Sequence, residues 1–337
     1  MNKRLWKLKL GEKENSHRYE RKGNAIAMHK LYLKNIDVRF GEFYDLKMLK
    51  SNNLVFSEEC NLENFGYVGC YVSNKDKECY EKSIQDNFIE EYEIENIDYI
   101  LYNSTFIEYK NFNLNEKRFM EYFLDYPLNR CLDKLNKSVP HIGITQQACN
   151  GLFSCIEHAN RLLRNNEKLN NVLCISDDIL PKNCYYDRPE QRMLFSDNIS
   201  GVTISREKSC YELVDIKNIH IANDNYFLFI HSVNCLIDDL CKANLIQRSK
   251  IRNFFVPNFW GDAWSSIIKA GSNDEICFYN NMKKYAHGLS ADFLVNISEY
   301  KDLNRFEQDG YYIGISYGYG GNISCLLFKY CSYSNVN

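Results

Sequence analysis

Cys149 is the residue of this sequence whose type and setting most favour nucleophilic chemistry. It follows a short apolar run over 139–145 that predicts a buried strand, and it precedes apolar residues that recur at helical spacing from Leu152 to Leu163. This pattern places Cys149 in the first turn of a helix, where free backbone N–H groups and the positive end of the helix dipole stabilise a thiolate. A cysteine that only fills space in the core is the alternative, and this stretch alone does not decide between the two.

The elements that would position Cys149 alternate between strands and helices along the chain. Apolar patterns predict strands over 25–39, 97–106, 139–145, 171–179, 211–221, 253–256, 311–316 and 323–328, a turn followed by a strand over 194–204, and a further extended segment over 64–73. Helical spacing predicts helices over 78–95, 118–135, 152–165, 226–244 and 262–269, and a turn that opens a helix over 285–296. Such alternation is typical of an α/β architecture with mostly parallel sheets, which bind ligands at the carboxyl ends of strands.

The composition describes a globular chain and argues against several classes of function. The 337 residues are 45% hydrophobic, which is enough for a large core, and the length suggests two domains or two halves. The net charge of −3 gives no strong field for nucleic acid or an anionic membrane, and no apolar run reaches the roughly 18 residues of a membrane span. No signal peptide opens the chain, and its 14 cysteines fit a reducing cytoplasm. None of them is paired at the C-x2-C spacing of zinc sites, so no metal or other cofactor is expected.

Six motifs in a fixed order carry a resemblance to a known family. They are QQACNG, NVLCISDDI, LFSDNISG, KANLIQRSKIRNFFVPN, YAHGLSAD and GISYGYGGNISCLLF. Together they resemble the ketoacyl synthase III family of the thiolase fold, over about residues 25–329. The resemblance implies a five-layered αβαβα fold with two pseudo-duplicated halves, 25–205 with Cys149 and 206–337 with His287, after a basic N-terminal tail over 1–24.

One departure from the family pattern changes the reaction that the resemblance implies. Cys149 falls on the family's acyl-accepting cysteine, whereas Asn258 stands where condensing members carry a histidine, and His287 where they carry an asparagine. Condensing members use that histidine and asparagine together to hold an enolate oxygen. The run AHGLSAD is instead similar to the A-H-x-x-x-x-D signature of a divergent branch, the acyltransferases of antibiotic pathways. This similarity implies Cys149 as nucleophile, His287 as base and Asp292 as the acid that orients the histidine.

The remaining expected site residues follow from the resemblance, for Gly320, and from a departure from it, since the chain between 204 and 251 is shorter than the family pattern and aromatic residues after Asn258 can line the entry. The backbone N–H groups of Cys149 and Gly320 would hold the oxyanion, since glycine lets the backbone approach closely. Asn258, Phe259 and Trp260 are expected to line the mouth of the pocket.

Each of these assignments has a structural alternative. His287 can be an ordinary turn histidine, Asp292 can cap the helix that follows it, and the glycines around Gly320 can form only a tight turn. Asn258 can assist the oxyanion or close a turn after Pro257. Four further ionisable residues are treated as structural acids (Asp177, Asp178) or as additional acid or base candidates (His220, His231).

The sequence therefore predicts an acyltransferase of secondary metabolism, of the antibiotic or polyketide kind, that forms an acyl-Cys149 intermediate. The expected donor is an acyl carrier protein or acyl-coenzyme A thioester, and the expected acceptor is a small-molecule or carrier-bound O, N or S nucleophile. A cytoplasmic homodimer without nucleic-acid or membrane partners is expected. Two rivals stay open: a decarboxylating condensing enzyme of the ketoacyl synthase III type, and a catalytically silent partner subunit of a heterodimer. Carbon dioxide release from a malonyl carrier, and acyl mass gained at Cys149, distinguish the three.

Overall fold

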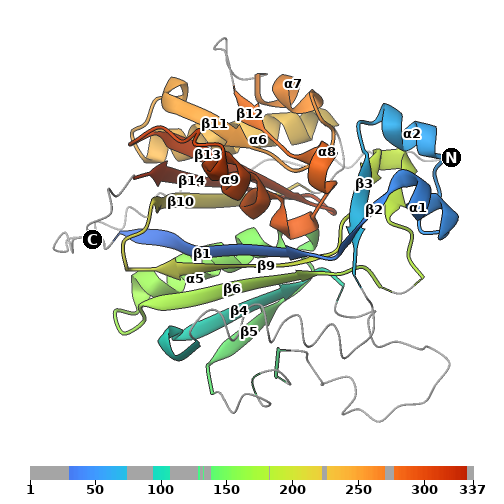
Figure 1. The fold of residues 1–337 in the computed structure, drawn as a ribbon. Coiled ribbons are helices and arrows are strands. Elements are labelled where there is room, and N and C mark those ends of the chain that lie inside the picture. The colour runs from blue at the N-terminus through green and yellow to red at the C-terminus, as the bar shows by residue number, and fades with distance from the viewer. Residues whose placement is uncertain are drawn as a thin grey trace, which may run out of the picture.

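The computed structural model describes residues 30–73, 94–106, 128–129, 132, 138–181, 183–221, 226–269 and 277–331. Within these ranges, ten strands pair side by side in the order β5-β4-β6-β9-β1-β10-β14-β13-β11-β12 (Figure 1). The N-terminal five are β1 (Leu31–Phe40), β4 (Tyr99–Ser104), β5 (His141–Ile144), β6 (Asn171–Asp178) and β9 (Asn198–Ser205). The C-terminal five are β10 (Tyr211–His220), β11 (Ile251–Phe255), β12 (Phe278–Tyr279), β13 (Tyr311–Gly318) and β14 (Asn322–Tyr330).

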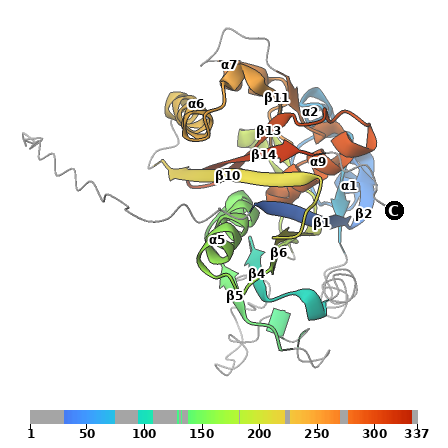
Figure 2. The ribbon, with the colours of Figure 1, turned by 90° about the vertical axis from the view of Figure 1, so that its left-hand side faces the viewer.

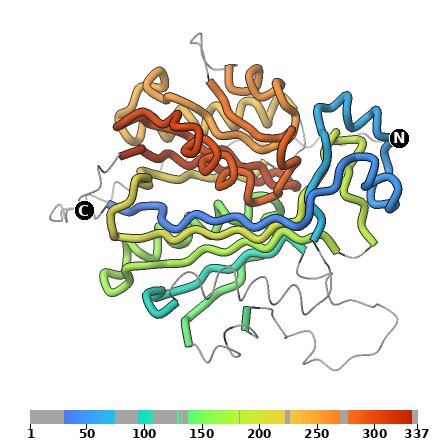
Figure 3. Tube along the Cα trace, in the orientation of Figure 1, coloured from blue at the N-terminus to red at the C-terminus, as the bar shows by residue number. Residues whose placement is uncertain are grey.

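The two sets of five strands repeat one plan. In the N-terminal set, β1 pairs antiparallel with β9 and β9 with β6, while β6, β4 and β5 run parallel. In the C-terminal set, β10 pairs antiparallel with β14 and β14 with β13, while β13, β11 and β12 run parallel. Among the described strands, β1 and β10 join the sets through three residue pairs, from Leu31–Leu213 to Leu33–Tyr211 (Figure 3). The prediction of two pseudo-duplicated halves is confirmed.

Helices lie between and outside the two sets of strands. The longer ones are α5 (Gly151–Asn165), α6 (Tyr226–Ala243), α7 (Ala263–Lys269) and α9 (Asp292–Asp302). Shorter elements are β2 (Glu42–Asp45), α1 (Leu46–Ser51), α2 (Glu59–Asn64), β3 (Gly69–Val72), β7 (Asp187–Arg188), β8 (Met193–Leu194) and α8 (Met282–Tyr285). In Figure 2, α5 lies beside β4 and β5, whereas α6 and α7 lie beyond β10 and β14.

Alternating side chains along the strands separate five layers. Along β6, Cys174 packs in a central core with α5 and α9, whereas its neighbour Leu173 packs on the opposite face with the helical residue Leu128. Along β14, Leu326 packs in the same central core, and Leu327 packs against α6 and α7 on the far side. Because successive side chains of a strand point to opposite faces, the order of layers is helix, sheet, helix, sheet, helix. This is the αβαβα arrangement that the sequence predicts.

The run over 139–145 contains a strand, but the prediction that this strand is buried is wrong. β5 ends the row of described strands and is paired with β4 alone, and three of its four residues are exposed. Ile142 exposes 50% of its surface. An apolar run predicts burial only if other segments cover the strand, and no described segment covers this edge.

The described residues include only some of the other predicted elements. The tail over 1–24 and nearly all of the helices predicted over 78–95 and 118–135 lie outside the described residues. The segment over 42–72 holds β2, α1, α2 and β3, of which the sequence predicts only the extended stretch over 64–73 that contains β3. None of the helices within the described ranges is long and apolar enough to cross a membrane.

Candidate active site

Cys149 lies in a tight turn that leads directly into α5. This turn, η5 (Ala148–Asn150), follows β5, and the backbone is left-handed at Gln146 and Ala148, with φ of 62° and 46°. Such values are strained for residues with a side chain, and strain of this kind clusters at functional sites. Ser316 Oγ, from β13, donates to the carbonyl oxygen of Cys149 over 3.0 Å. The C-terminal half therefore helps to fix the turn that carries the sulfur.

The first residue of α5 must be glycine because the helix starts directly against β4. A Cβ atom on Gly151 would lie 2.0 Å from Oδ1 of Asn103, closer than real Cβ contacts allow. This close packing fixes the position of the first helical turn, and with it the position of Cys149, relative to the sheet.

His287 belongs to the C-terminal half, but backbone of the N-terminal half holds it. Its N–H donates to the carbonyl of Leu194 over 2.8 Å, and its carbonyl accepts from the N–H of Ser196 over 2.9 Å. Ala286, just before it, is left-handed with φ of 52°. The imidazole is 1% exposed. His287 is thus buried at the junction of the two halves, whereas an ordinary turn histidine would be exposed to solvent.

The sulfur, the imidazole and the carboxylate of Asp292 lie in one line of contacts. Nε2 of His287 is 3.3 Å from Sγ of Cys149, and Nδ1 donates to Oδ2 of Asp292 over 2.5 Å. Asp292 begins α9 but does not cap it, because its Oδ1 accepts from the N–H of Gly288 and its Oδ2 also accepts from the N–H of Asn258, both over 2.7 Å. An acid at Nδ1 fixes the tautomer of the ring and directs Nε2 to the nucleophile.

The surroundings of His287 favour its protonated form. Burial alone lowers the pKa of a histidine, but the carboxylate of Asp292 and then the charge on Cys149 outweigh burial and raise the pKa of His287 to about 10. A proton retained on the ring and a thiolate on the sulfur stabilise each other. The resting site is therefore suited to hold an ion pair between Cys149 and His287.

Cys149 and His287 open into a cavity of about 680 Å³, here called the catalytic cavity. Apolar side chains form most of its wall (Phe106, Leu180, Met193, Phe195, Phe259 and Leu289). Arg188, which lies in none of the motifs noted in the sequence, also lines the cavity, and its guanidinium is 4.5 Å from the centroid of the Tyr319 ring. The sequence around Arg188 does not indicate a position in the cavity wall, because that position depends on the fold, which brings β7 close to the turn after β13. A lining of this kind accepts the apolar part of an acyl group.

Of the three residues expected at the mouth of the pocket, Phe259 alone lines the catalytic cavity. Asn258 is buried behind Asp292, and its Oδ1 accepts from the N–H of Asn281 over 2.7 Å. Trp260 lines a neighbouring cavity instead. The left-handed backbone at Trp260, with φ of 60°, turns the chain away from the sulfur directly after Phe259.

Gly320, the expected second oxyanion donor, does not line the catalytic cavity either. It is exposed in the turn between β13 and β14, and no atom lies within 4 Å of the place of its missing Cβ. The glycine that approaches the turn carrying Cys149 is Gly318, where a Cβ would lie 2.3 Å from the carbonyl oxygen of Gln147. The glycine-rich run was the correct signal, but the close approach occurs two residues earlier than expected.

The other ionisable residues that the sequence singles out lie elsewhere or support the fold. Oδ2 of Asp178 accepts from the N–H of Ser290 over 3.0 Å and so holds the turn that follows His287. Burial, and then the neighbouring Asp178, raises the pKa of Asp177 well above its ordinary value. His220 and His231 are exposed on β10 and α6. Among the described residues, no three His, Cys, Asp or Glu side chains are grouped so as to hold a metal ion.

This arrangement of strands and helices matches solved structures at low sequence identity. The acyltransferase ChlB3 superposes with a TM-score of 0.72 at 13% identity, over 90% of this chain and 98% of that one. The 3-oxoacyl-(acyl carrier protein) synthase III of Aquifex aeolicus gives a TM-score of 0.68 at 14% identity, over 89% and 100% of the two chains. OleA of Xanthomonas campestris gives 0.68 at 10% identity, over 90% and 99%. The chain has the thiolase fold.

The likeness lies in structure rather than in sequence. No protein-family profile matches the chain, and no curated protein matches it. Within this thiolase fold, Cys149 comes from one half and His287 from the other, and the catalytic cavity lies where the halves meet.

Proposed function

We propose that this protein is an acyltransferase that moves an acyl group from a thioester donor, through a thioester on Cys149, to an O, N or S nucleophile. The observation that carries the proposal is the line of contacts from Sγ of Cys149 to Nε2 of His287 (3.3 Å) and from Nδ1 to Asp292 (2.5 Å). A thiol, a base and an acid in this order form an activated nucleophile.

In the first half-reaction, the thiolate of Cys149 attacks the carbonyl carbon of the donor thioester. The carbon–sulfur bond to the donor then breaks, and the donor leaves as a thiol with the proton that His287 carries. The oxyanion formed on the way lies at the N-terminal turn of α5, where the N–H of Cys149 and the helix dipole stabilise negative charge.

In the second half-reaction, His287 works as a base. Acylation removes the negative charge of Cys149, which is one of the causes that raise the pKa of His287, so the ring accepts a proton more weakly after loading than before. The acceptor gives its proton to Nε2 as its oxygen, nitrogen or sulfur attacks the acyl carbon. The bond from that carbon to Sγ of Cys149 breaks, and the thiolate–imidazolium pair returns.

The placement of Asn258 favours transfer over decarboxylative condensation. A condensing enzyme needs two donors aimed at the enolate oxygen. Here His287 is the one of the two positions that reaches the catalytic cavity, while the backbone and side chain of Asn258 are bonded to Asp292 and Asn281 behind it. Without a second donor at the oxygen, the enolate of a malonyl group lacks the stabilisation that condensation requires.

An acyl carrier protein or coenzyme A is the proposed carrier of the donor group. Two of the similar structures support this choice, because ChlB3 is an acyltransferase and the Aquifex aeolicus protein is a 3-oxoacyl-(acyl carrier protein) synthase III. The A-H-x-x-x-x-D pattern from His287 to Asp292 supports a place in secondary metabolism, in antibiotic or polyketide assembly.

We also propose a cytoplasmic homodimer. Among the described strands, β5 is paired on one side only, so a second β5 strand could pair along its other edge and continue the sheet. The twelve described cysteines are all free thiols, as a reducing compartment favours. Sedimentation of the full chain tests the dimer, and a monomer at micromolar concentration contradicts it.

Intact-protein mass spectrometry after incubation with acyl-coenzyme A and acyl carrier protein donors tests the function. We expect one acyl mass on the wild-type chain and none on Cys149→Ala, followed by loss of that mass when an acceptor is added. Malonyl carrier protein is the matched substrate for the rival reaction. Carbon dioxide release with carbon–carbon bond formation would indicate a condensing enzyme, and a chain that gains no acyl mass from any donor would indicate a silent partner subunit.

A further inference from the structure

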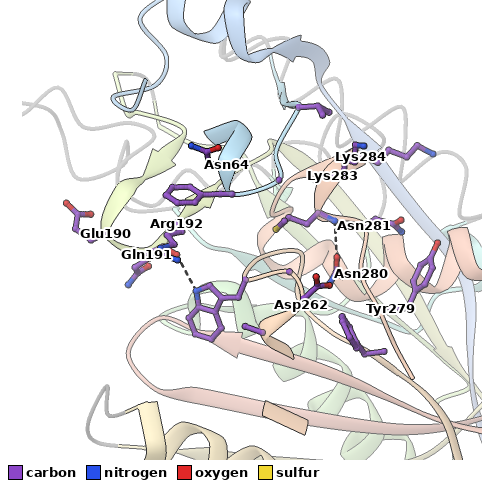
Figure 4. A pocket seen from close by; sticks show the side chains of 18 of the residues that line it. Asn64, Glu190, Gln191, Arg192, Asp262, Tyr279, Asn280, Asn281, Lys283 and Lys284 are labelled. Atoms are coloured by element: carbon purple, nitrogen blue, oxygen red, sulfur yellow. Dashed lines mark hydrogen bonds between the residues drawn. The ribbon is translucent and has the colours of Figure 1, made fainter. Parts of the chain in front are cut away.

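A second cavity, of about 1230 Å³, lies beside the catalytic cavity and has no part in the steps above (Figure 4). Its wall comes from the end of α2, the turn over 190–192, the segment over 260–263 and the segment over 278–284. Gln191 lines both cavities. The side chain of Gln191 therefore lies at the boundary between the two cavities.

The partition between the cavities is thin and consists of aromatic rings. Nε1 of Trp260 donates to the carbonyl oxygen of Gln191 over 3.3 Å, the bond drawn at Gln191 in Figure 4. The Trp260 ring meets the Phe259 ring edge-on at 4.7 Å between centroids, and Phe259 meets the His287 ring at 4.8 Å. The second cavity is thus two aromatic rings away from the catalytic imidazole.

Hydrogen bonds also connect the wall of the second cavity to the triad. Asn281, which lines the cavity, donates its N–H to Oδ1 of Asn258, and Asn258 donates its own N–H to Oδ2 of Asp292, each over 2.7 Å. A ligand that fixes the position of Asn281 would therefore also fix the position of Asp292, the carboxylate that orients the catalytic histidine.

The backbone of this wall is strained at two points. Arg192 and Trp260 both line the second cavity and have left-handed φ values of 54° and 60°. Strain at a non-glycine residue costs about 1–3 kcal/mol and persists where the surrounding structure requires it. The surrounding structure therefore holds these two turns of the cavity wall in place.

The charges in the second cavity are balanced. Arg192 and Lys283 bring two cations, Glu190 and Asp262 bring two carboxylates, and none of the four forms an ion pair with another described residue. Lys284 is neutralised by Glu299. A phosphate-rich ligand would need an excess of cations, so the balance argues against a nucleotide or a phosphorylated carrier arm in this place.

The uncharged lining combines carboxamides with aromatic rings. Asn64, Gln191 and Asn280 each offer both a donor and an acceptor, as a hydroxyl group does, while Trp260 and Tyr279 offer flat apolar surfaces. Alternating donors, acceptors and ring faces suit a molecule with several hydroxyl groups on a carbon ring.

We propose that the second cavity binds the acyl acceptor, and that this acceptor is an uncharged molecule with several hydroxyl groups, one of which reaches past Gln191 and is acylated. The inference rests on the proposed function. The hydroxyl oxygen attacks the acyl carbon, its proton passes to Nε2 of His287, and the carbon–sulfur bond to Cys149 breaks to restore the thiolate.

Tryptophan fluorescence of the full chain tests this binding without any acyl donor. Maltose and methyl glucoside serve as uncharged probes, with glucose 6-phosphate and glucosamine as charged controls. We expect a saturable change with the uncharged probes, because Trp260 lines the cavity, and about tenfold or more weaker binding of the charged ones. Ala263→Tyr fills the cavity and should weaken binding by about tenfold or more, whereas Ser266→Tyr, exposed on the same helix outside the lining, should not.

The outcomes separate this inference from the proposed function. No saturable change with either uncharged probe, tighter binding of glucose 6-phosphate, or unchanged binding by Ala263→Tyr overturns the acceptor site. Acyl loading of Cys149, measured by mass on the same variants, should remain unchanged, because the donor is proposed to use the catalytic cavity. Absence of loading on the wild-type chain contradicts the proposed function and leaves the binding result to stand by itself.

Discussion

Oδ2 of Asp292 lies 2.5 Å from Nδ1 of His287, only five residues earlier in the chain. The N–H groups of Gly288 and Asn258 hold the same carboxylate over 2.7 Å each, so it cannot turn away from the ring. This short loop directs Nε2 of His287 toward Cys149 in the other half of the molecule. The relationship gives a physical reason for the A-H-x-x-x-x-D spacing.

Asp292→Asn should lower the rate of acyl transfer by about 10²–10⁴-fold. The amide removes the charge that raises the pKa of His287 and no longer enforces the tautomer with Nε2 directed at the sulfur. Single-turnover transfer from preloaded enzyme measures the effect. Asp302→Asn, an exposed change at the other end of α9, is the matched control and should act like the wild type. A loss of less than about tenfold in Asp292→Asn would remove the acid from the mechanism.

The raised pKa of His287 predicts a loss of stability at high pH. Below about 6.5, both the folded and the unfolded chain hold the proton, and the stabilisation is complete; it is lost as pH rises through the folded value of about 10. The free energy of unfolding should therefore fall between these limits more steeply in the wild type than in His287→Gln. Denaturant titrations at pH 6, 8 and 10 measure it. Parallel profiles of unfolding free energy against pH for the two proteins would contradict the raised pKa of His287.

Gly151→Ala should destabilise the fold by about 1–3 kcal/mol and lower the rate of acyl loading. The added Cβ meets the Asn103 side chain at 2.0 Å, so the start of α5 must shift and carry Cys149 with it. Gly143→Ala is the matched control, because the nearest atom to its Cβ is 4.0 Å away. Denaturation midpoints and loading rates of both variants measure the effect. Equal midpoints and equal rates for the two variants would show that α5 does not pack closely against β4 at Gly151.

Asn258→Ala should cost about 1–3 kcal/mol of stability but leave acyl loading within about tenfold of the wild type. The change strands the N–H of Asn281 without its acceptor, whereas the backbone N–H of residue 258 still holds Asp292. Loading rate and denaturation midpoint are measured on the same preparation. A loading defect as deep as that of Asp292→Asn would mean that the Asn258 side chain takes part in the chemistry.

Features of the site that depend on residues close together in the chain could be predicted from the sequence. The strand-to-helix junction at Cys149 and the spacing from His287 to Asp292 are short-range features, and the structure brings all three residues together. The exposure of β5 was missed because burial depends on which segment covers an edge, and no residue within 139–145 encodes that.

Placement of the remaining residues depended on backbone twists that residue types do not reveal. Trp260 turns out of the catalytic cavity at its left-handed φ, a conformation rarely expected of tryptophan. Gly320 and Gly318 are equivalent as letters, yet only Gly318 packs against the nucleophile turn. Arg188 lines the cavity because the tertiary fold brings β7 close to the turn after β13.

The most direct test of the triad follows the two half-reactions separately in His287→Ala and Cys149→Ala, by intact mass before and after an acceptor is added. Cys149→Ala should gain no acyl mass at all. His287→Ala should still gain the acyl mass, more slowly than the wild type, and then fail to pass it on, because the acceptor has no base. Acyl mass on Cys149→Ala, or transfer from loaded His287→Ala at the wild-type rate, would contradict the roles assigned to the sulfur and the imidazole.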